Sequence, residues 1–199
     1  MLGTTEPGSG LLLASFVHES PARIAIAPEH APAVEGEFAF RLGRDLPPRA
    51  DAYVRDEVAD AVAAVAGAIE VVGTRFAGGL EGKGRLLVTA DCGANVAFVS
   101  GPWRANWRSL DLKAHAVAMQ VNGTVRGSGT GARALGDPMT VLLWLANQQS
   151  RDGRGLKSGE IVTTGTCTGL DPVGPGDRAQ ADFGELGRVE IVFAPWGKA

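Results

Sequence analysis

The chain has 199 residues and a formal net charge of -3, and 45% of its residues are hydrophobic. This length and composition suit one globular domain spanning 1–199, with enough chain to bury a core. The mild acidity, the scattered Lys and Arg residues and the short apolar runs argue against both a nucleic-acid partner and a membrane partner.

Residues 11–17 (LLLASFV) are expected to form a buried strand or a short apolar segment, and an irregular, proline-containing stretch follows over 21–32. The side chains of residues 35–42 alternate between two faces, which predicts a strand. The strand cannot continue through Pro47 and Pro48, because proline has no N–H to donate to a β-ladder.

The first helix is predicted over 51–68, where Asp51 offers an N-cap. Its apolar residues recur at helical spacing: Val54, Val58, Ala61, Val62 and Val65. The β-branched stretch 69–72 predicts a buried strand, and the Gly-rich stretch 78–85 predicts a mobile loop.

The second half contains the clearest local signals. The pair Asn122-Gly123 predicts a hairpin between strands at 116–121 and 124–127. Asp137 and Pro138 open a second helix that Gly153 is expected to end. Further strands are predicted over 95–99, 160–164, 178–183 and 188–193. Many strands with two main helices, not in strict alternation, predict an α+β fold built on a mixed β-sheet roll or sandwich.

Three acidic residues stand in otherwise apolar strands. Glu35 and Glu37 share one strand face, and Glu70 lies in the apolar stretch AIEVVGTRF. Converging carboxylates repel one another unless a cation joins them, and an all-oxygen ligand set favours Mg²⁺ or Mn²⁺. The alternative is that Glu35 and Glu37 are solvated while Glu70 pairs with Arg75, and the spacing alone leaves both interpretations open.

Other motifs carry weaker signals. GSGTG (127–131) fits neither a nucleophile elbow nor a phosphate loop and predicts a tight turn, whereas TTGTCTG (163–169) could line a pocket with hydroxyls. No histidine has metal-ligand spacing, and His18, beside Glu19, is the one candidate pocket residue. The two cysteines are far apart and form no CxxC pair, which indicates a reducing, cytoplasmic setting rather than a disulfide or zinc site.

Five blocks of sequence, in this order and at this spacing, resemble one enzyme family. They are VEGEFAFRLGRDL, AIEVVGTRF, ADCGANVAFVSG, DLKAHAVAMQVNGTVRGSGTGARALGDPMTVLLWLAN and LKSGEIVTTGTCTGLDPVGPGDRAQADFGELGRVEIVF. The chain is similar to the 2-keto-4-pentenoate hydratase and 4-oxalocrotonate decarboxylase branch of the fumarylacetoacetate hydrolase superfamily, from about its N-terminus to Phe193.

The resemblance implies a single catalytic domain with a mixed β roll, in which Glu35, Glu37 and Glu70 hold Mg²⁺ or Mn²⁺. It implies a cytoplasmic homo-oligomer that acts on 2-oxo or 2-hydroxydienoic acids. The activity that it favours is that of a hydratase in the breakdown of aromatic compounds. Glu37 and Thr166 would be catalytic, and Thr164 and Thr166 would contact the substrate. A 2-oxo-diacid decarboxylase and a C–C hydrolase remain open on the same scaffold.

The chain also departs from the family pattern. Family members carry an N-terminal helical region with a substrate-contacting Lys, and this chain is expected to begin after that region. Lys83, in FAGGLEGKG, is the candidate replacement, although a Lys in such a loop is more often a solvated residue. A catalytically silent scaffold that only binds metal or 2-oxo acids is therefore a further alternative.

Overall fold

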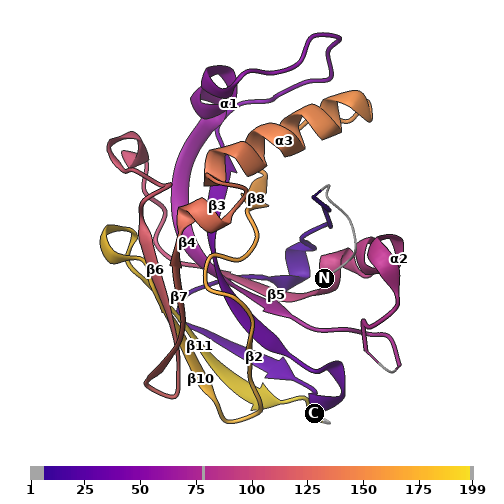
Figure 1. Ribbon diagram of the computed structural model, residues 1–199, viewed down its shortest axis with the longest axis vertical. Coiled ribbons are helices and arrows are strands. Elements are labelled where there is room, and N and C mark those ends of the chain that lie inside the picture. Colours follow the sequence, from indigo (N-terminus) through magenta and orange to yellow (C-terminus); the bar gives the residue numbers. More distant parts are fainter. Residues whose placement is uncertain (1–6, 78, 198–199) are drawn as a thin grey trace.

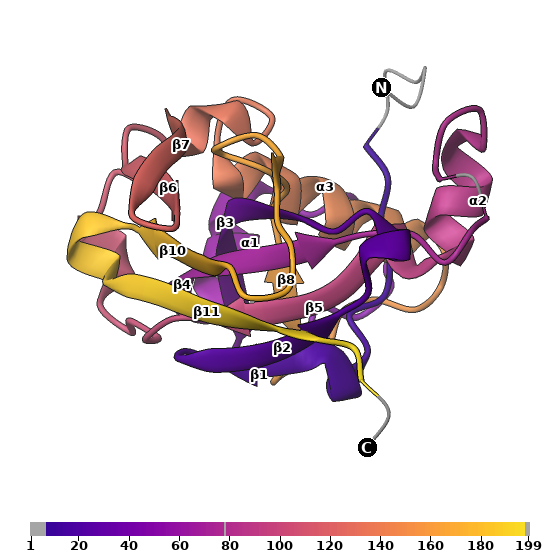
Figure 2. The same cartoon turned by 90° about the horizontal axis from the view of Figure 1, so that it is seen from below.

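The computed structural model describes residues 7–77 and 79–197. Two β-sheets pack against each other, as Figures 1 and 2 show from two directions. The first sheet contains, in spatial order, β1 (Val17–Glu19), β5 (Asn95–Ser100), β4 (Val62–Val72), β3 (Ala33–Leu42) and β8 (Ile161–Thr163), and β9 (Asp171–Pro172) also pairs with β3. The second contains β2 (Ala22–Ile26), β11 (Arg188–Pro195), β10 (Arg178–Asp182), β6 (Ala116–Val121) and β7 (Thr124–Thr130).

Both sheets mix strand directions. β1 runs parallel to β5 and β2 runs parallel to β11, whereas the other paired strands are antiparallel. The expected α+β fold with a mixed β-sheet roll or sandwich is therefore confirmed.

The helices are α1 (Arg55–Ala61), α2 (Gly84–Ala90) and α3 (Pro138–Arg151), with 3-10 turns η1 (Ala14–Phe16), η2 (Pro28–His30), η3 (Cys92–Ala94), η4 (Trp107–Ser109), η5 (Gly131–Arg133) and η6 (Gly184–Leu186). Figure 1 places α1 and α3 together at one end, and α2 at the side of the molecule. The Tyr53 N–H donates to Asn147 Oδ1 at 2.7 Å, which ties the chain before α1 to α3. No helix in the described part of the chain is long and apolar enough to cross a membrane.

The core lies between the inner faces of the two sheets. Phe38 of β3 and Phe183, just after β10, are fully buried, with ring centroids 5.6 Å apart in an edge-to-face arrangement. Gly67 of β4 lies under the Phe183 ring, where an added Cβ would sit 2.3 Å from Cδ2. This contact explains why the centre of β4 has no side chain at that position.

The hairpin and the long helix form where the local signals predict them. Asn122 and Gly123 have φ values of 52° and 77°, which the turn between β6 and β7 requires. Asp137 caps α3 by accepting a hydrogen bond from the Met139 N–H at 2.8 Å, with Pro138 at the first helical position.

The predicted helix over 51–68 is wrong in its second half. The helix covers Arg55–Ala61, and β4 begins at Val62. Its N-cap is Val54 rather than Asp51, and Glu57 accepts the Val54 N–H at 3.0 Å. The stretch from residue 62 is a strand because it pairs with β3 and β5 on both sides, and a strand buried on both faces gives a nearly continuous apolar run.

Four shorter predictions also need correction. In 11–17 the strand starts only at Val17, where β5 offers a pairing edge, and 21–32 contains β2 because β11 pairs with it. The expected loop at 78–85 gives way to α2 from Gly84, while residue 78 lies outside the described part of the chain. GSGTG is mostly the end of β7, because its backbone pairs with β6.

Candidate metal centre

The pairing of β3 with β4 brings three glutamates together. Glu35 is directly opposite Glu70 in the ladder, and Glu37 follows two residues later on the same face of β3. One carboxylate oxygen from each residue lies within 4.8 Å of the others. Glu37 is completely buried, whereas Glu35 and Glu70 keep some exposed surface.

Burial and mutual repulsion disfavour ionisation of this cluster. Burial, followed by the charges of Glu37 and Glu70, raises the pKa of Glu35 from 4.5 to about 10. Burial and the Glu37 charge likewise raise the pKa of Glu70 well above its usual value. Three carboxylates this close need a compensating positive charge to be ionised at neutral pH.

Hydrogen bonds hold one carboxylate oxygen of Glu37 and one of Glu70. Glu37 Oε2 accepts from the Thr163 hydroxyl and, at 2.9 Å, from the Gly165 N–H. Asn95 Nδ2 donates to Glu70 Oε1 at 2.7 Å. The sequence does not single out Thr163 or Asn95 as site residues. Thr163 does stand in the segment 163–169, which predicts a pocket lined with hydroxyls.

One buried oxygen supports a cation site at this cluster. Glu37 Oε1 is buried and has no hydrogen-bond partner in the described structure. A carboxylate oxygen in this state is costly unless it binds a ligand. Because every candidate ligand atom is oxygen, the residues fit a hard divalent cation.

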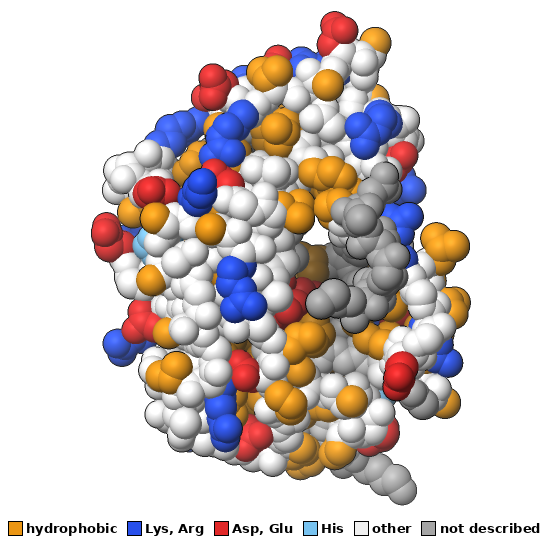
Figure 3. Space-filling view, in the orientation of Figure 1, with side chains coloured by type: hydrophobic (Ala, Val, Ile, Leu, Met, Phe, Trp, Pro, Cys, Tyr) orange, Lys and Arg blue, Asp and Glu red, His pale blue; other side chains and the backbone are white. Residues whose placement is uncertain are grey.

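The same sheet face continues as an apolar floor. Ala39, Ala68 and Phe98 are fully buried there. The residues packed on them are Leu12, Val17, Trp103 and Ile161. Figure 3 shows a hollow near the middle of one face of the molecule, with acidic and apolar side chains around it. Apolar surroundings strengthen the electrostatic interactions of the adjacent carboxylates.

A family model described as fumarylacetoacetate (FAA) hydrolase C-terminal matches residues 11–194. The chain belongs to the fumarylacetoacetate hydrolase family. It is 32% identical over 193 residues to 2-keto-4-pentenoate hydratase of Paraburkholderia xenovorans (strain LB400), covering 96% of this chain and 70% of the relative. It is 33% identical over 196 residues to 2-hydroxyhexa-2,4-dienoate hydratase of Comamonas testosteroni, covering 97% and 72%.

The fold agrees with this assignment. The structure of 4-oxalocrotonate decarboxylase from Pseudomonas putida G7, complexed with magnesium and adipate, superposes with a TM-score of 0.86 at 27% identity. The match covers 96% of this chain and 72% of that one. Together these likenesses identify a hydratase-like enzyme of the fumarylacetoacetate hydrolase superfamily.

Thr164 and Thr166, the two threonines predicted to contact substrate, have different surroundings. The buried Thr164 hydroxyl accepts from the Phe38 N–H and donates to the Phe38 carbonyl, both at 3.2 Å, so it joins the segment to β3. The Thr166 hydroxyl accepts from the Gly169 N–H at 2.8 Å and donates to the Gly169 carbonyl at 3.2 Å, and it lies close enough to Glu35 to oppose the rise in the pKa of that carboxyl. Of the two hydroxyls, that of Thr166 is therefore the one beside the glutamate cluster.

The two remaining candidate residues come from β1 and from the chain before α2. His18 is opposite Val99 in the pairing of β1 with β5, whereas Glu70 is opposite the neighbouring Phe98, so His18 belongs to the other sheet face. Lys83 precedes α2, and its Nζ lies 5.8 Å from the centroid of the Phe76 ring.

The alternative pairing of Glu70 with Arg75 is not formed. Arg75 Nη1 donates to Asp91 Oδ1 at 2.8 Å, and Arg75 Nη2 donates to the Asn95 carbonyl at 2.8 Å. Arg75 therefore supports the backbone of the residue that contacts Glu70, rather than neutralising Glu70 itself.

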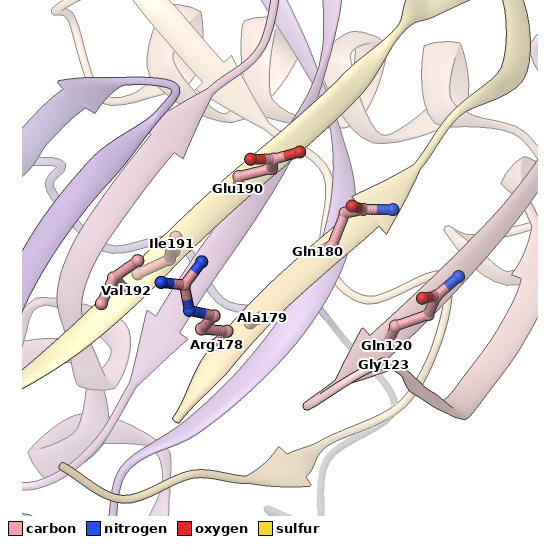
Figure 4. A pocket seen from close by; sticks show the side chains of 8 residues that line it. All are labelled: Gln120, Gly123, Arg178, Ala179, Gln180, Glu190, Ile191 and Val192. Atoms are coloured by element: carbon pink, nitrogen blue, oxygen red, sulfur yellow. The ribbon is translucent and has the colours of Figure 1, made fainter. Parts of the chain in front are cut away.

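Two further hollows lie outside the cluster. One, of about 290 Å³, lies on the strands of the second sheet and is shown in Figure 4; its lining includes Gln120, Arg178, Gln180 and Glu190. The other, of about 300 Å³, is lined by Arg126, Asp171 and Pro172. Neither brings together groups with the charge and burial of the three glutamates.

Proposed function

We propose that this chain is a divalent-metal-dependent hydro-lyase that hydrates 2-hydroxydienoic or 2-oxo acids in the breakdown of aromatic compounds. Glu35, Glu37 and Glu70 are the proposed ligands, and Mg²⁺ or Mn²⁺ the proposed ion. The observation that carries the proposal is the cluster itself: three buried or half-buried carboxylates within 4.8 Å, one of which has an oxygen that accepts no hydrogen bond from the described residues. The names of the relatives support the substrate class.

The bound ion would supply Lewis-acid stabilisation of the negative charge that develops on a 2-oxo acid. The residues of the chain have their own tasks. The glutamates would hold the ion, and the Thr166 hydroxyl, close to Glu35, would hydrogen-bond a substrate oxygen. The apolar floor at Ala39, Ala68 and Phe98 keeps bulk water from one side of the cluster.

The remaining assignments belong to the same proposal. We propose a single catalytic domain over 1–199 that works as a cytoplasmic homo-oligomer. Lys83 is proposed as a cation for the substrate, whereas His18, on the opposite sheet face, is given no role at the cluster. Replacing Lys83 by Met tests the role of Lys83, because loss of a substrate contact would raise KM while leaving metal affinity unchanged.

The test follows the loss of dienol absorbance of 2-hydroxypenta-2,4-dienoate with and without Mg²⁺ or Mn²⁺. We expect turnover only with metal, and we expect Glu37→Gln to abolish it while the matched exposed control Glu29→Gln keeps it. Undiminished turnover by the metal-free wild-type chain would refute the proposal.

Decarboxylation is a second candidate, supported by the likeness to 4-oxalocrotonate decarboxylase. Product analysis separates the two activities, because decarboxylation of an oxo-diacid releases CO₂ and hydration of a dienoic monoacid does not. Tight oxalate binding without turnover of any 2-oxo acid would instead indicate a silent scaffold.

A further inference from the structure

The two oxygens of Glu37 have opposite environments. Oε2 accepts two hydrogen bonds, from the Thr163 hydroxyl and the Gly165 N–H, whereas Oε1 accepts none from the described residues. Thr163 is opposite Ala39 in the pairing of β8 with β3, so its side chain lies on the glutamate face. The carboxylate is therefore held by one oxygen while the other is left for a ligand.

Glu70 is held in a similar way by Asn95. Asn95 is 1% exposed, and its Nδ2 donates to Glu70 Oε1 at 2.7 Å and lies 3.4 Å from the Ala97 carbonyl oxygen. These two contacts fix the plane of the amide. The backbone of Asn95 is fixed in turn by Arg75, whose guanidinium also pairs with Asp91.

Resting on the proposed function, we propose that Thr163 and Asn95 are positioning residues for the metal-binding carboxylates. Each one fixes a single oxygen of its glutamate, Oε2 of Glu37 or Oε1 of Glu70, so that the side chain keeps one rotamer before the cation arrives. Without these donors the two glutamates would have to be ordered during binding. Loss of such an outer contact typically weakens metal affinity by about 10–100-fold.

The experiment measures Mn²⁺ binding to the chelator-treated full chain, by calorimetry and by the electron paramagnetic resonance spectrum of the bound ion. Thr163→Val and Asn95→Leu remove the donors with little change in volume, and Thr163→Ser restores the hydroxyl. Thr124→Val on β7 and Asn106→Leu before η4 are matched exposed controls. Thermal unfolding without metal reports the stability of each variant, and Thr163→Ala and Asn95→Ala replace any variant that does not fold.

We expect the Mn²⁺ Kd to rise about 10–100-fold in Thr163→Val and Asn95→Leu, to return to within about threefold in Thr163→Ser, and to be unchanged in the controls. Folded variants that bind Mn²⁺ within about twofold of wild type overturn the positioning role alone, because the metal site then stands without it. A wild-type chain that binds no Mn²⁺ overturns the proposed function and the positioning role together.

Discussion

Removing the divalent cation should make the stability of the fold decrease as the pH rises. In the metal-free chain, burial and the neighbouring carboxylates raise the pKa of Glu35 from 4.5 to about 10. Between these values the folded chain keeps a proton that the unfolded chain has released. Its stabilising effect is complete below about pH 4.5 and is lost progressively as the pH rises through that window.

One retained proton corresponds to a slope of about 1.4 kcal/mol per pH unit. From about pH 6 to about pH 8 the free energy of unfolding should therefore fall by about 2.7 kcal/mol, an upper value for this one group. In a chain of this size the corresponding decrease in Tm is about 5–10 °C. The pKa of Glu70 is raised in the same direction and adds to the effect.

The assay is urea or thermal unfolding at several pH values, with chelator and with excess Mn²⁺. Glu35→Gln is the control, because it removes the titrating group while keeping its size, and its slope with pH should be shallower than that of wild type. Mn²⁺ should stabilise wild type more at about pH 8 than at about pH 6, since binding requires ionised carboxylates. Equal slopes for metal-free wild type and Glu35→Gln would show that Glu35 does not hold a proton in the metal-free fold.

Three further outcomes concern the fold and the thiols. Gly67→Ala should destabilise the chain by about 1–3 kcal/mol in urea unfolding, because the new Cβ overlaps the buried Phe183 ring; unchanged stability would mean that the ring moves aside. Asp137→Ala should cost about 1 kcal/mol through the lost cap of α3, whereas Asp137→Asn should recover most of it. Burial raises the pKa of the Cys167 thiol to about 12. A thiol reagent at about pH 8 should therefore label the half-buried Cys92 in the folded chain and reach Cys167 only on unfolding. Equal labelling rates for the two thiols would contradict this order.

Elements with complete local signals could be predicted from the sequence. α3 begins at an Asp-Pro pair, and the turn between β6 and β7 contains an Asn-Gly pair that tolerates positive φ. In both cases the residues that determine the element lie within a few positions of it.

Elements determined by distant partners could not be predicted in this way. Val58, Val62 and Val65 match helical spacing, yet the chain changes to a strand at Val62 because β3 and β5 pair with it on both sides. β2 has the same explanation, since only pairing with β11 makes a proline-flanked stretch regular.

The candidate site shows the same division. Alternation along one strand placed Glu35 and Glu37 on a common face, and the register of β3 with β4 brings Glu70 opposite Glu35. The contacts from Thr163 and Asn95 depend on β8 and β5, which are far away in the sequence, and no local pattern signals them.

The pairing of β2 with β11 affects when the second sheet can fold during translation. Ala22 is aligned with Ile191, so the early strand has no partner in its own sheet until about 170 further residues have been synthesised. At about 5–20 residues per second, that strand waits roughly ten to thirty seconds on the ribosome. The second sheet can therefore be completed only after β11 has been synthesised, and loss of β11 should leave β2 unpaired and β10 with an open edge, which favours aggregation over folding.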